Sequence, residues 1–407
     1  FYTKEAEYFR THNPVPSLLP PYPGLDGGTF GHWGNQDEAF WADGRWNQTD
    51  LGSLLSGVFR GAGVTAPKGI CVRLGDQGEL AACFDPSTLC YEALWSGGFV
   101  RFSDVRHGFM DGLILDGTPL PRPEGKKPEK PFEYRGFYRN GKRVLFAYRI
   151  DGVDYLDAPW VKDGKFERIV APSHSHPLRA LIEGGQPQWP QTLRTRGTLG
   201  TLSPYALDTI EPPFKNPWKA PLFFGGHDFL PDGSALVCTM QGDVWRVEGL
   251  DASLSNVRWR RFASGLHQAL GLVVSDGLPY VLGRDQITRL HDLNGDGEAD
   301  FYECFSNAYE TSTAGHDFIC GLERDASGNF YTVSGKLGLI RISPDGKRVD
   351  VLATGFRNAD GLGLAPDGSI TVPNSEREWV PTSMICEVRK GGHYGYLGPK
   401  NNQPPDV

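Results

Sequence analysis

Four segments in the second half of the chain repeat one layout, and this repeat constrains the fold more than any other feature. Each has polar residues at its entrance, an apolar strand, a turn with Asp or Ser before Gly, and a second apolar strand. The turn glycines are Gly233, Gly277, Gly328 and Gly368, spaced by 44, 51 and 40 residues. Antiparallel strands that repeat roughly every 40–50 residues are typical of β-propeller blades. The sequence therefore predicts an all-β protein with a β-propeller, six- or seven-bladed when complete.

The rest of the chain divides at a proline-rich, charged stretch. Short aromatic- and glycine-rich strands in residues 1–120 predict a small β-sandwich-like N-terminal domain with an extended arm. Residues 121–131, PRPEGKKPEKP, have the composition of a linker. We assign residues 132–407 to the propeller, which begins with hairpins marked by Asn-Gly and Asp-Gly turns. These blades do not obviously close a ring, so we expect the remainder of the propeller to come from a further segment or partner.

Composition limits the partners. Hydrophobic content of 39% and charged content of 22% suit a soluble globular protein, and 41 Lys+Arg against 49 Asp+Glu gives a net charge of −8, which argues against nucleic acid. No stretch reaches the roughly 18 apolar residues of a transmembrane segment. The chain starts without Met and without a signal peptide, which predicts a processed protein that is periplasmic or otherwise exported. Its seven cysteines include no CxxC, so this chain has no CxxCH haem attachment.

The segment DLNGDGEADFYE, residues 292–303, matches the spacing of a calcium-binding loop. Oxygen ligands recur at the expected positions, and Gly297 allows the sharp turn. The expected ligands are Asp292, Asn294, Asp296, Glu298 through its carbonyl, Asp300 and a bidentate Glu303. The flanks have the pattern of strands, so the alternative is an acidic hairpin tip without an ion. Hard oxygen ligands favour Ca²⁺, in a structural role.

Polar residues at the blade entrances predict a site on the propeller axis. Residues that open the innermost strand of a blade point at the central channel, where propellers bind ligands. The repeat places four polar pairs there: His227/Asp228, His267/Gln268, His316/Asp317 and Arg357/Asn358. We interpret the pairs as one convergent ring that lines a binding site; the alternative is a purely structural, hydrogen-bonded channel.

The end of the chain resembles a known family. GFRNADGL (355–362), NSERE (374–378) and GGHYGY (391–396) follow one another as do similar motifs of the soluble quinoprotein glucose/sorbosone dehydrogenases. The segment from Gly315 is similar to the blade that carries the catalytic base in that family. Nearly the whole chain resembles multidomain proteins of Planctomycetes and Verrucomicrobia, in which a β domain precedes such a propeller and a haem-binding c-type cytochrome domain follows it.

The resemblance implies roles for individual residues. His316 would take the proton from a substrate hydroxyl, with Asp317 beside it in the catalytic set. Arg357 would stabilise charge on the oxygen of pyrroloquinoline quinone (PQQ). The other cofactor-binding candidates are Asn358, His227, His267 and Glu376. A second calcium would lie near Ser375–Glu378 and Tyr394, and electrons would pass to a haem c in a separate domain or chain.

Three functions follow as hypotheses. The first is an exported sugar or polyol dehydrogenase with a quinone in the propeller channel and a c-type cytochrome as electron acceptor. The second is a metal-dependent carbohydrate hydrolase or lyase, with His227, His267, His316 and Asp317 as candidate ligands. The third is a non-catalytic glycan-binding module. The departures from the quinoprotein pattern, such as Ala359 where that family has proline, keep all three open.

Overall fold

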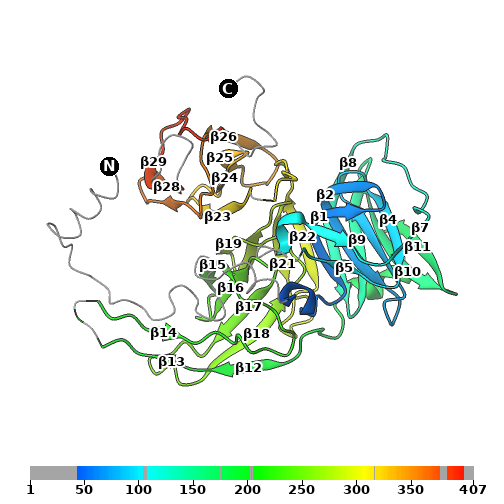
Figure 1. Cartoon of the computed structure of the whole chain (residues 1–407), viewed down its shortest axis with the longest axis horizontal. Coiled ribbons are helices and arrows are strands. Elements are labelled where there is room, and N and C mark those ends of the chain that lie inside the picture. The colour runs from blue at the N-terminus through cyan, green and yellow to red at the C-terminus, as the bar shows by residue number, and fades with distance from the viewer. Residues whose placement is uncertain are drawn as a thin grey trace.

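The computed structural model is built almost entirely from β-strands (Figure 1). It describes residues 44–397, except 104–107, 175, 202, 204, 316 and 376–382. The helices in this part are short: η3 (Arg45–Gln48), η4 (Gly108–Asp111), α3 (His176–Arg179) and η5 (Ala180–Ile182). None of the described helices is long and apolar enough to cross a membrane. The predicted all-β fold class is confirmed.

The first sheet has seven strands in the order β5-β6-β1-β2-β3-β4-β7. Its strands are β1 (Leu54–Gly61), β2 (Val64–Leu74), β3 (Leu80–Asp85), β4 (Cys90–Ser96), β5 (Val100–Arg101), β6 (Leu113–Leu115) and β7 (Thr118–Leu120). The long strands β1 to β4 pair antiparallel with their neighbours in sequence. All residues of β3 are buried, because this central strand is covered on both faces.

The strands after the linker form a second layer on this sheet. They are β8 (Phe132–Asn140), β9 (Arg143–Ile150), β10 (Val153–Lys162) and β11 (Lys165–Pro172). Their three turns carry Gly141, Gly152 and Gly164 in the left-handed region, as the predicted hairpins require. Phe146 of β9 stacks on Phe84 of β3 with ring centroids 3.9 Å apart. The linker therefore connects two layers of one sandwich.

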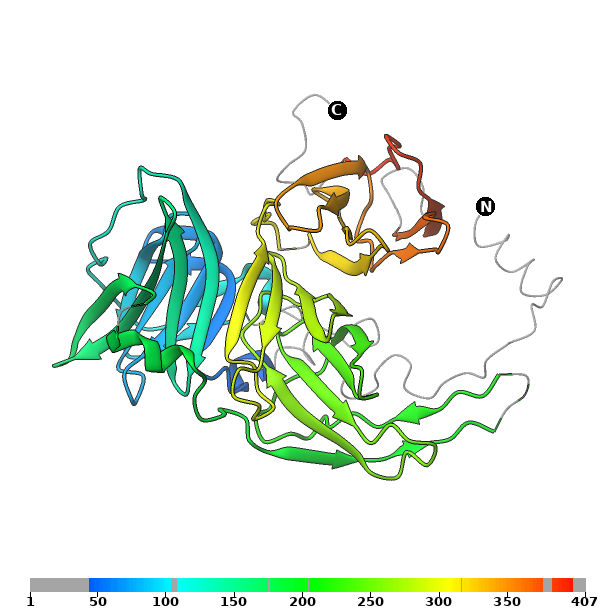
Figure 2. The same ribbon diagram turned by 180° about the vertical axis from the view of Figure 1, so that it is seen from behind.

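Four propeller blades follow (Figures 1 and 2). The first has β15 (Phe224–Phe229), β16 (Ala235–Thr239), β17 (Val244–Glu248) and β18 (Val257–Ala263), extended by β12 (Thr192–Thr195). The second has β19 (Gly271–Ser275), β20 (Leu278–Leu282), β21 (Ile287–His291) and β22 (Phe301–Ser306). The third has β23 (Ile319–Arg324), β24 (Phe330–Ser334), β25 (Gly338–Ile342) and β26 (Val349–Ala353). The fourth has β27 (Gly363–Leu364), β28 (Ile370–Asn374) and β29 (Met384–Glu387).

The sandwich and the propeller share one hydrogen-bonded sheet. Strand β8 pairs antiparallel with β22, the outer strand of the second blade, which gives the order β11-β10-β9-β8-β22-β21-β20-β19. The sequence places residues 132–172 at the start of the propeller, whereas in the structure they pack on the first sheet. The remaining strands, β13 (Gly197–Thr198) and β14 (Thr209–Ile210), form a small hairpin before the first blade.

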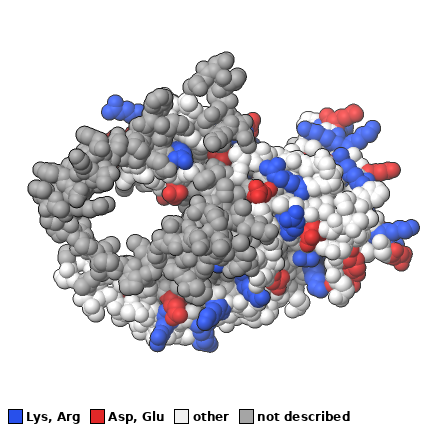
Figure 3. All heavy atoms as spheres, viewed as in Figure 1, with Lys and Arg blue, Asp and Glu red and all other residues white. Residues whose placement is uncertain are grey.

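The first sheet also lies against the blade entrances. The amide of Ser56 on β1 donates to the carbonyl of Gly265, just before the second entrance, at 2.8 Å. Phe59 and Trp95 belong to the same buried apolar cluster as Leu270 and Phe318, which precede β19 and β23. On the described part of the face in Figure 3, Lys and Arg alternate with Asp and Glu, in keeping with the modest net charge.

Candidate functional site

Glycines fix how the blades line up around the axis. Gly226, Gly271 and Gly321 each lie against a Gly-Leu pair at the inner strand of the next blade. A Cβ on any of the three would contact the backbone nitrogen of the leucine in that pair. The three contacts are Gly226 with Leu272 N, Gly271 with Leu322 N and Gly321 with Leu362 N, at 2.9, 2.7 and 2.9 Å. Only residues without a side chain allow the inner strands to approach this closely. The blades therefore align on Gly226, Gly271, Gly321 and Gly361.

This register changes which entrance residues match. In the second, third and fourth blades, the aligned glycine is preceded, four positions earlier, by an entrance residue: His267, Asp317 or Arg357. Asp317 rather than His316 therefore corresponds to the other two. The next position holds Gln268 in the second blade and Asn358 in the fourth. Both have the left-handed backbone, with φ of 49° and 40°, which is rare for residues with a side chain. Such strain often occurs at binding sites and independently supports the register.

The register separates His227 from this ring. His227 follows Gly226 directly and lies on β15 itself, exposed, with its ring 6.3 Å from that of Phe229. Both carboxylate oxygens of Asp228 accept hydrogen bonds from backbone amides. Oδ2 accepts from the amide of Val274 at 2.7 Å, and Oδ1 accepts from the amide of Phe229 at 2.8 Å. The expected equivalence of this pair with the other three therefore does not hold in the structure.

Arg284 joins the second and third entrances. Its Nη1 donates to Oε1 of Gln268 at 3.1 Å, and its Nη2 donates to the carbonyls of Ser312 and Ala314, both at 2.8 Å. The side chain is 4% exposed, and burial lowers its pKa while Asp317 acts in the opposite direction. Ala314 and Asp317 flank His316, which lies outside the described residues. Arg284 thus places a buried cation beside the segment that carries the expected base.

Arg284 was not among the site residues predicted from the sequence. It lies in the turn between β20 and β21, and its amide donates to the carbonyl of His267 at 2.9 Å. The corresponding turn of the third blade holds Lys336, whose amide donates to Oδ1 of Asp317 at 3.1 Å. A Gly-Arg in one turn and a Gly-Lys in the next were the available signal. The turns between second and third strands therefore reach the same face as the entrances.

His267 is a buried, uncharged histidine. It is 3% exposed, and its Nδ1 has no hydrogen-bond partner and lies 4.0 Å from Oδ1 of Asp285. Burial lowers the pKa of His267 well below its ordinary value, and the cations of Arg284 and Lys68 lower it further. Burial also raises the pKa of Asp285, to about 6, although Lys68 opposes the shift. Near neutral pH the imidazole is therefore neutral beside a mostly ionised carboxylate.

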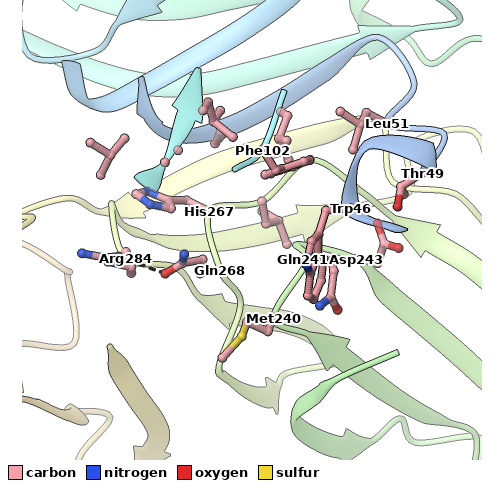
Figure 4. A pocket seen from close by; sticks show the side chains of 18 of the residues that line it. Trp46, Thr49, Leu51, Phe102, Met240, Gln241, Asp243, His267, Gln268 and Arg284 are labelled. Carbon is pink, nitrogen blue, oxygen red and sulfur yellow. Dashed lines mark hydrogen bonds between the residues drawn. The ribbon is translucent and has the colours of Figure 1, made fainter. Parts of the chain in front are cut away.

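A cavity lies between this face and the first sheet (Figure 4). His267, Gln268 and Arg284 line one side, and Trp46 of η3, Gln241 and Asp243 line the other. The space open to the centre of a water molecule is ≈ 40 Å³, enough for about three waters. Among the lining residues, Nε2 of Gln241, Oδ2 of Asp243, Nε of Arg261 and Nδ1 of His267 are buried without a partner.

These unpaired atoms indicate which chemical groups the cavity can bind. Nε2 of Gln241 and Nε of Arg261 donate, the carboxylate oxygen of Asp243 accepts, and Nδ1 of His267 does either according to its tautomer. Buried polar atoms without partners are costly, so a group that satisfies them gains free energy. A hydroxyl both donates and accepts. The cavity therefore has the donor and acceptor set for a hydroxylated neutral molecule, or for ordered water.

The fourth entrance opens into a second hollow. Its lining includes Asn358, Asp360, Asn374 and Ser375. The space open to the centre of a water molecule is ≈ 320 Å³. Asn374 is 1% exposed; its Oδ1 accepts from the amide of Arg357 at 2.7 Å, while its Nδ2 is buried without a partner. Glu376, the expected cofactor contact beside this hollow, lies outside the described residues. The hollow therefore offers a donor next to Arg357 and Asn358.

Asp317 is the described member of the expected catalytic set in the third entrance. It is 5% exposed, and burial raises the pKa of its carboxyl while Arg284 opposes the shift. Oδ1 of Asp317 accepts from the amide of Lys336 at 3.1 Å. Its hydrogen bond joins the third entrance to the neighbouring hairpin turn.

The candidate calcium loop closes on its own hydrogen bonds. Asp292 accepts from the amides of Gly295, Asp296 and Gly297. Asn294 donates to Oδ2 of Asp296 at 3.0 Å, and Asp300 accepts from the amide of Leu293 at 2.8 Å. These contacts keep the four short acidic or amide side chains of the loop together. They also stabilise the turn without an ion.

The two glutamates of this loop have other partners. Glu298 pairs with Arg139 at 3.0 Å, and Glu303 pairs with both Arg289 and His291 at 2.7 Å. Burial alone would raise the pKa of Glu303, but the hydrogen bonds from histidine and arginine lower it to about 2. The predicted bidentate ligand Glu303 therefore points to a salt bridge. Over the described residues, no three side chains of His, Cys, Asp or Glu are placed to hold a metal.

The ligand set of the hydrolase or lyase hypothesis is likewise dispersed. His227 lies on a strand outside the entrance ring, and His267 faces Asp285 and the cavity. Asp317 accepts from the turn of the third blade. The described residues therefore do not assemble His227, His267 and Asp317 into one metal centre.

Comparison with known proteins matches one part of the chain to a family. Residues 82–157 match a family described as a domain of unknown function, DUF6797. The match runs from β3 to β10 across the linker, so it spans strands of both sandwich layers. No curated protein matches the chain.

Similar solved structures are β-rich proteins of low sequence identity. A candidate oxidoreductase (glucose dehydrogenase) from Thermus thermophilus is 18% identical over 45% of this chain and 68% of its own, with a TM-score of 0.35. A Trichoderma reesei protein of carbohydrate-active enzyme family AA12 is 14% identical over 54% and 59%, with a TM-score of 0.32. A candidate 6-phosphogluconolactonase from Bacteroides uniformis is 11% identical over 83% and 96%, with a TM-score of 0.28. TM-scores this low establish no shared function.

Proposed function

We propose that the chain belongs to an exported sugar or polyol dehydrogenase that works with a quinone at the entrance face of the propeller. One observation supports the proposal most strongly: the buried guanidinium of Arg284 donates to Gln268 and to the carbonyls on either side of Thr313. It also interacts electrostatically with Asp317. The guanidinium adjoins a cavity whose unpaired polar atoms complement hydroxyl groups. Of the motifs that resemble the quinoproteins, GFRNADGL (355–362) lies at the fourth entrance.

The proposed site residues have separate roles in the oxidation of the substrate. The oxidation of an alcohol to a carbonyl releases one proton and one hydride from the substrate. His316 is proposed to take the proton, with Arg284 and Asp317 ordering its neighbourhood. Arg357, Asn358 and Nδ2 of Asn374 would hold the quinone in the fourth-entrance hollow, where a buried donor without a partner suits an anionic cofactor. When bound, the quinone supplies the two-electron acceptor, and a c-type cytochrome is the proposed onward acceptor.

The test is cofactor binding followed by turnover. The purified chain is titrated with PQQ in the presence of Ca²⁺, and dye reduction is measured against aldoses and polyols. We expect saturable binding and dye reduction, with turnover lost in His316→Ala and cofactor affinity reduced in Arg357→Ala. His174→Ala, in an exposed loop of the sandwich, is the control that should keep both. Absence of quinone binding would refute the dehydrogenase proposal, and glycan binding without turnover would favour a binding module.

A further inference from the structure

The segment before the third entrance is held from outside the propeller. Residues 307–318 connect β22 to β23 and, over their described part, contain no helix or strand. Lys68 on β2 of the first sheet donates from Nζ to the carbonyls of Asn307 and Tyr309, at 3.0 and 2.8 Å. Arg60 on β1 donates from Nη2 to the carbonyl of Thr313 at 2.8 Å. Two cations of the N-terminal sheet therefore bind backbone oxygens of the segment that leads to His316.

The second blade holds the same segment from the other side. Arg284 donates to the carbonyls of Ser312 and Ala314, as described above. The hydroxyl of Tyr309 donates to the carbonyl of Gly283, and that of Thr311 to the carbonyl of Arg284, at 2.8 and 2.7 Å. Carbonyl oxygens along the segment therefore accept hydrogen bonds from cations in two separate parts of the fold, the first sheet and the second blade.

These contacts replace the regular hydrogen bonds that the segment lacks. Backbone carbonyls need partners when they are removed from water, and hydrogen bonds from charged donors are stronger than those from neutral ones. The ammonium of Lys68 also lies 5.6 Å from the centre of the Tyr309 ring, within range of a cation–π contact. Burial lowers the pKa of Lys68 while Asp285 acts in the opposite direction, so the amine is close to the charged centre of the entrance face.

We propose that the N-terminal sheet orders the third entrance of the propeller, with Lys68 and Arg60 as positioning residues that hold residues 307–314, the segment that leads into this entrance. The sheet then has two roles: it forms one layer of the sandwich, and it orders the entrance face of the propeller. The effect on turnover rests on the proposed dehydrogenase function, whereas the ordering of the segment does not.

The first readout is hydrogen–deuterium exchange of the backbone amides in 307–315. We expect exchange at least ten times faster in Lys68→Met and Arg60→Met than in the unchanged chain, and largely restored protection in Lys68→Arg. The matched control is Lys142→Met, because Nζ of Lys142, in the turn between β8 and β9, also donates to a carbonyl of the other layer, that of Asp76 in the turn between β2 and β3, at 2.6 Å. Arg60 is partly exposed, so Arg60→Met tests the proposal if Lys68→Met fails to fold.

The second readout is turnover in the assay of the proposed function. We expect Lys68→Met and Arg60→Met to lower kcat at least tenfold with KM changed less than twofold, because they loosen the entrance segment and remove no proposed substrate contact. Unchanged exchange in both variants would refute the ordering. Faster exchange with unchanged kcat would refute the positioning role. If the unchanged chain shows no turnover, the dehydrogenase proposal fails, and the exchange experiment by itself decides whether the sheet orders the segment.

Discussion

Replacing Asp285 by asparagine tests the electrostatics of the entrance face. The carboxyl is 6% exposed and lies beside His267, and burial is the main reason that its pKa rises to about 6. Asparagine keeps the shape and one acceptor oxygen but cannot ionise. The substitution therefore removes the free-energy cost of holding a charge in this position and leaves the packing nearly unchanged.

The magnitude follows from the pKa. The shift from 3.8 to about 6 is about two pKa units, which corresponds to about 3 kcal/mol at roughly 1.4 kcal/mol per unit. Because the folded pKa is raised, the folded state binds the proton more tightly than the unfolded state does. The contribution of Asp285 to stability is fully present below pH 3.8 and is lost as the pH rises through about 6. At neutral pH, Asp285→Asn is expected to be more stable than the unchanged chain.

The assay is urea unfolding of both proteins at a series of pH values from 4 to 8. We expect the difference in the free energy of unfolding, variant minus unchanged, to grow by up to about 3 kcal/mol across this range, with most of the change complete once the pH has passed about 6. Asp163→Asn, an exposed carboxylate in a hairpin turn, is the control and should give a flat difference. A flat difference for Asp285→Asn would show that the carboxyl is solvated, and would refute the electrostatic description of the cavity wall.

Four further predictions test other parts of the molecule. His267→Gln should lose less stability than the unchanged chain as the pH falls from 6.5 to 5, because the buried imidazole has a lowered pKa; parallel thermal midpoints would contradict this. Gly271→Ala should cost about 1–3 kcal/mol in chemical denaturation, because its Cβ would lie 2.7 Å from Leu322 N, and equal stability would refute the blade register. Phe146→Ala should cost about 3–5 kcal/mol, since the ring is fully buried between the sandwich layers; a loss below about 1 kcal/mol would argue against that packing. If the 292–300 loop binds calcium, Ca²⁺ at about 100 times its Kd should add about 2.7 kcal/mol in thermal unfolding, and Asp292→Ala should abolish the gain; no gain in the unchanged chain would leave the loop without an ion.

The repeat and the turns were visible in the sequence because they depend on neighbouring residues. Asn-Gly and Asp-Gly need only a local left-handed backbone, so the hairpins of β8 to β11 were predictable. The spacing of the turn glycines was sufficient for the propeller, since each blade is a local unit. His267, Asp317 and Arg357 were also recognised as entrance residues. Their motifs lie within a few positions of a strand start, where the pattern is clear.

The exact register of the entrances and the partners of the charged residues were decided by the tertiary structure. The Gly-Leu pairs at 271, 321 and 361 are present in the sequence, but the contacts of these glycines between blades showed that the pairs align and that Asp317 is the match for His267. Glu303 fitted the bidentate position of a calcium motif, yet its carboxylate forms salt bridges with Arg289 and His291.

The sequence alone determined that the chain forms β-hairpins and propeller blades, and that polar residues gather where the blades begin. Only the tertiary structure placed the N-terminal sheet on that face, because the bonds of Lys68 and Arg60 join positions separated by 239 to 253 residues. Local propensity does not encode such contacts. They form because buried carbonyl oxygens need donors, and the fold brings these two cations within reach.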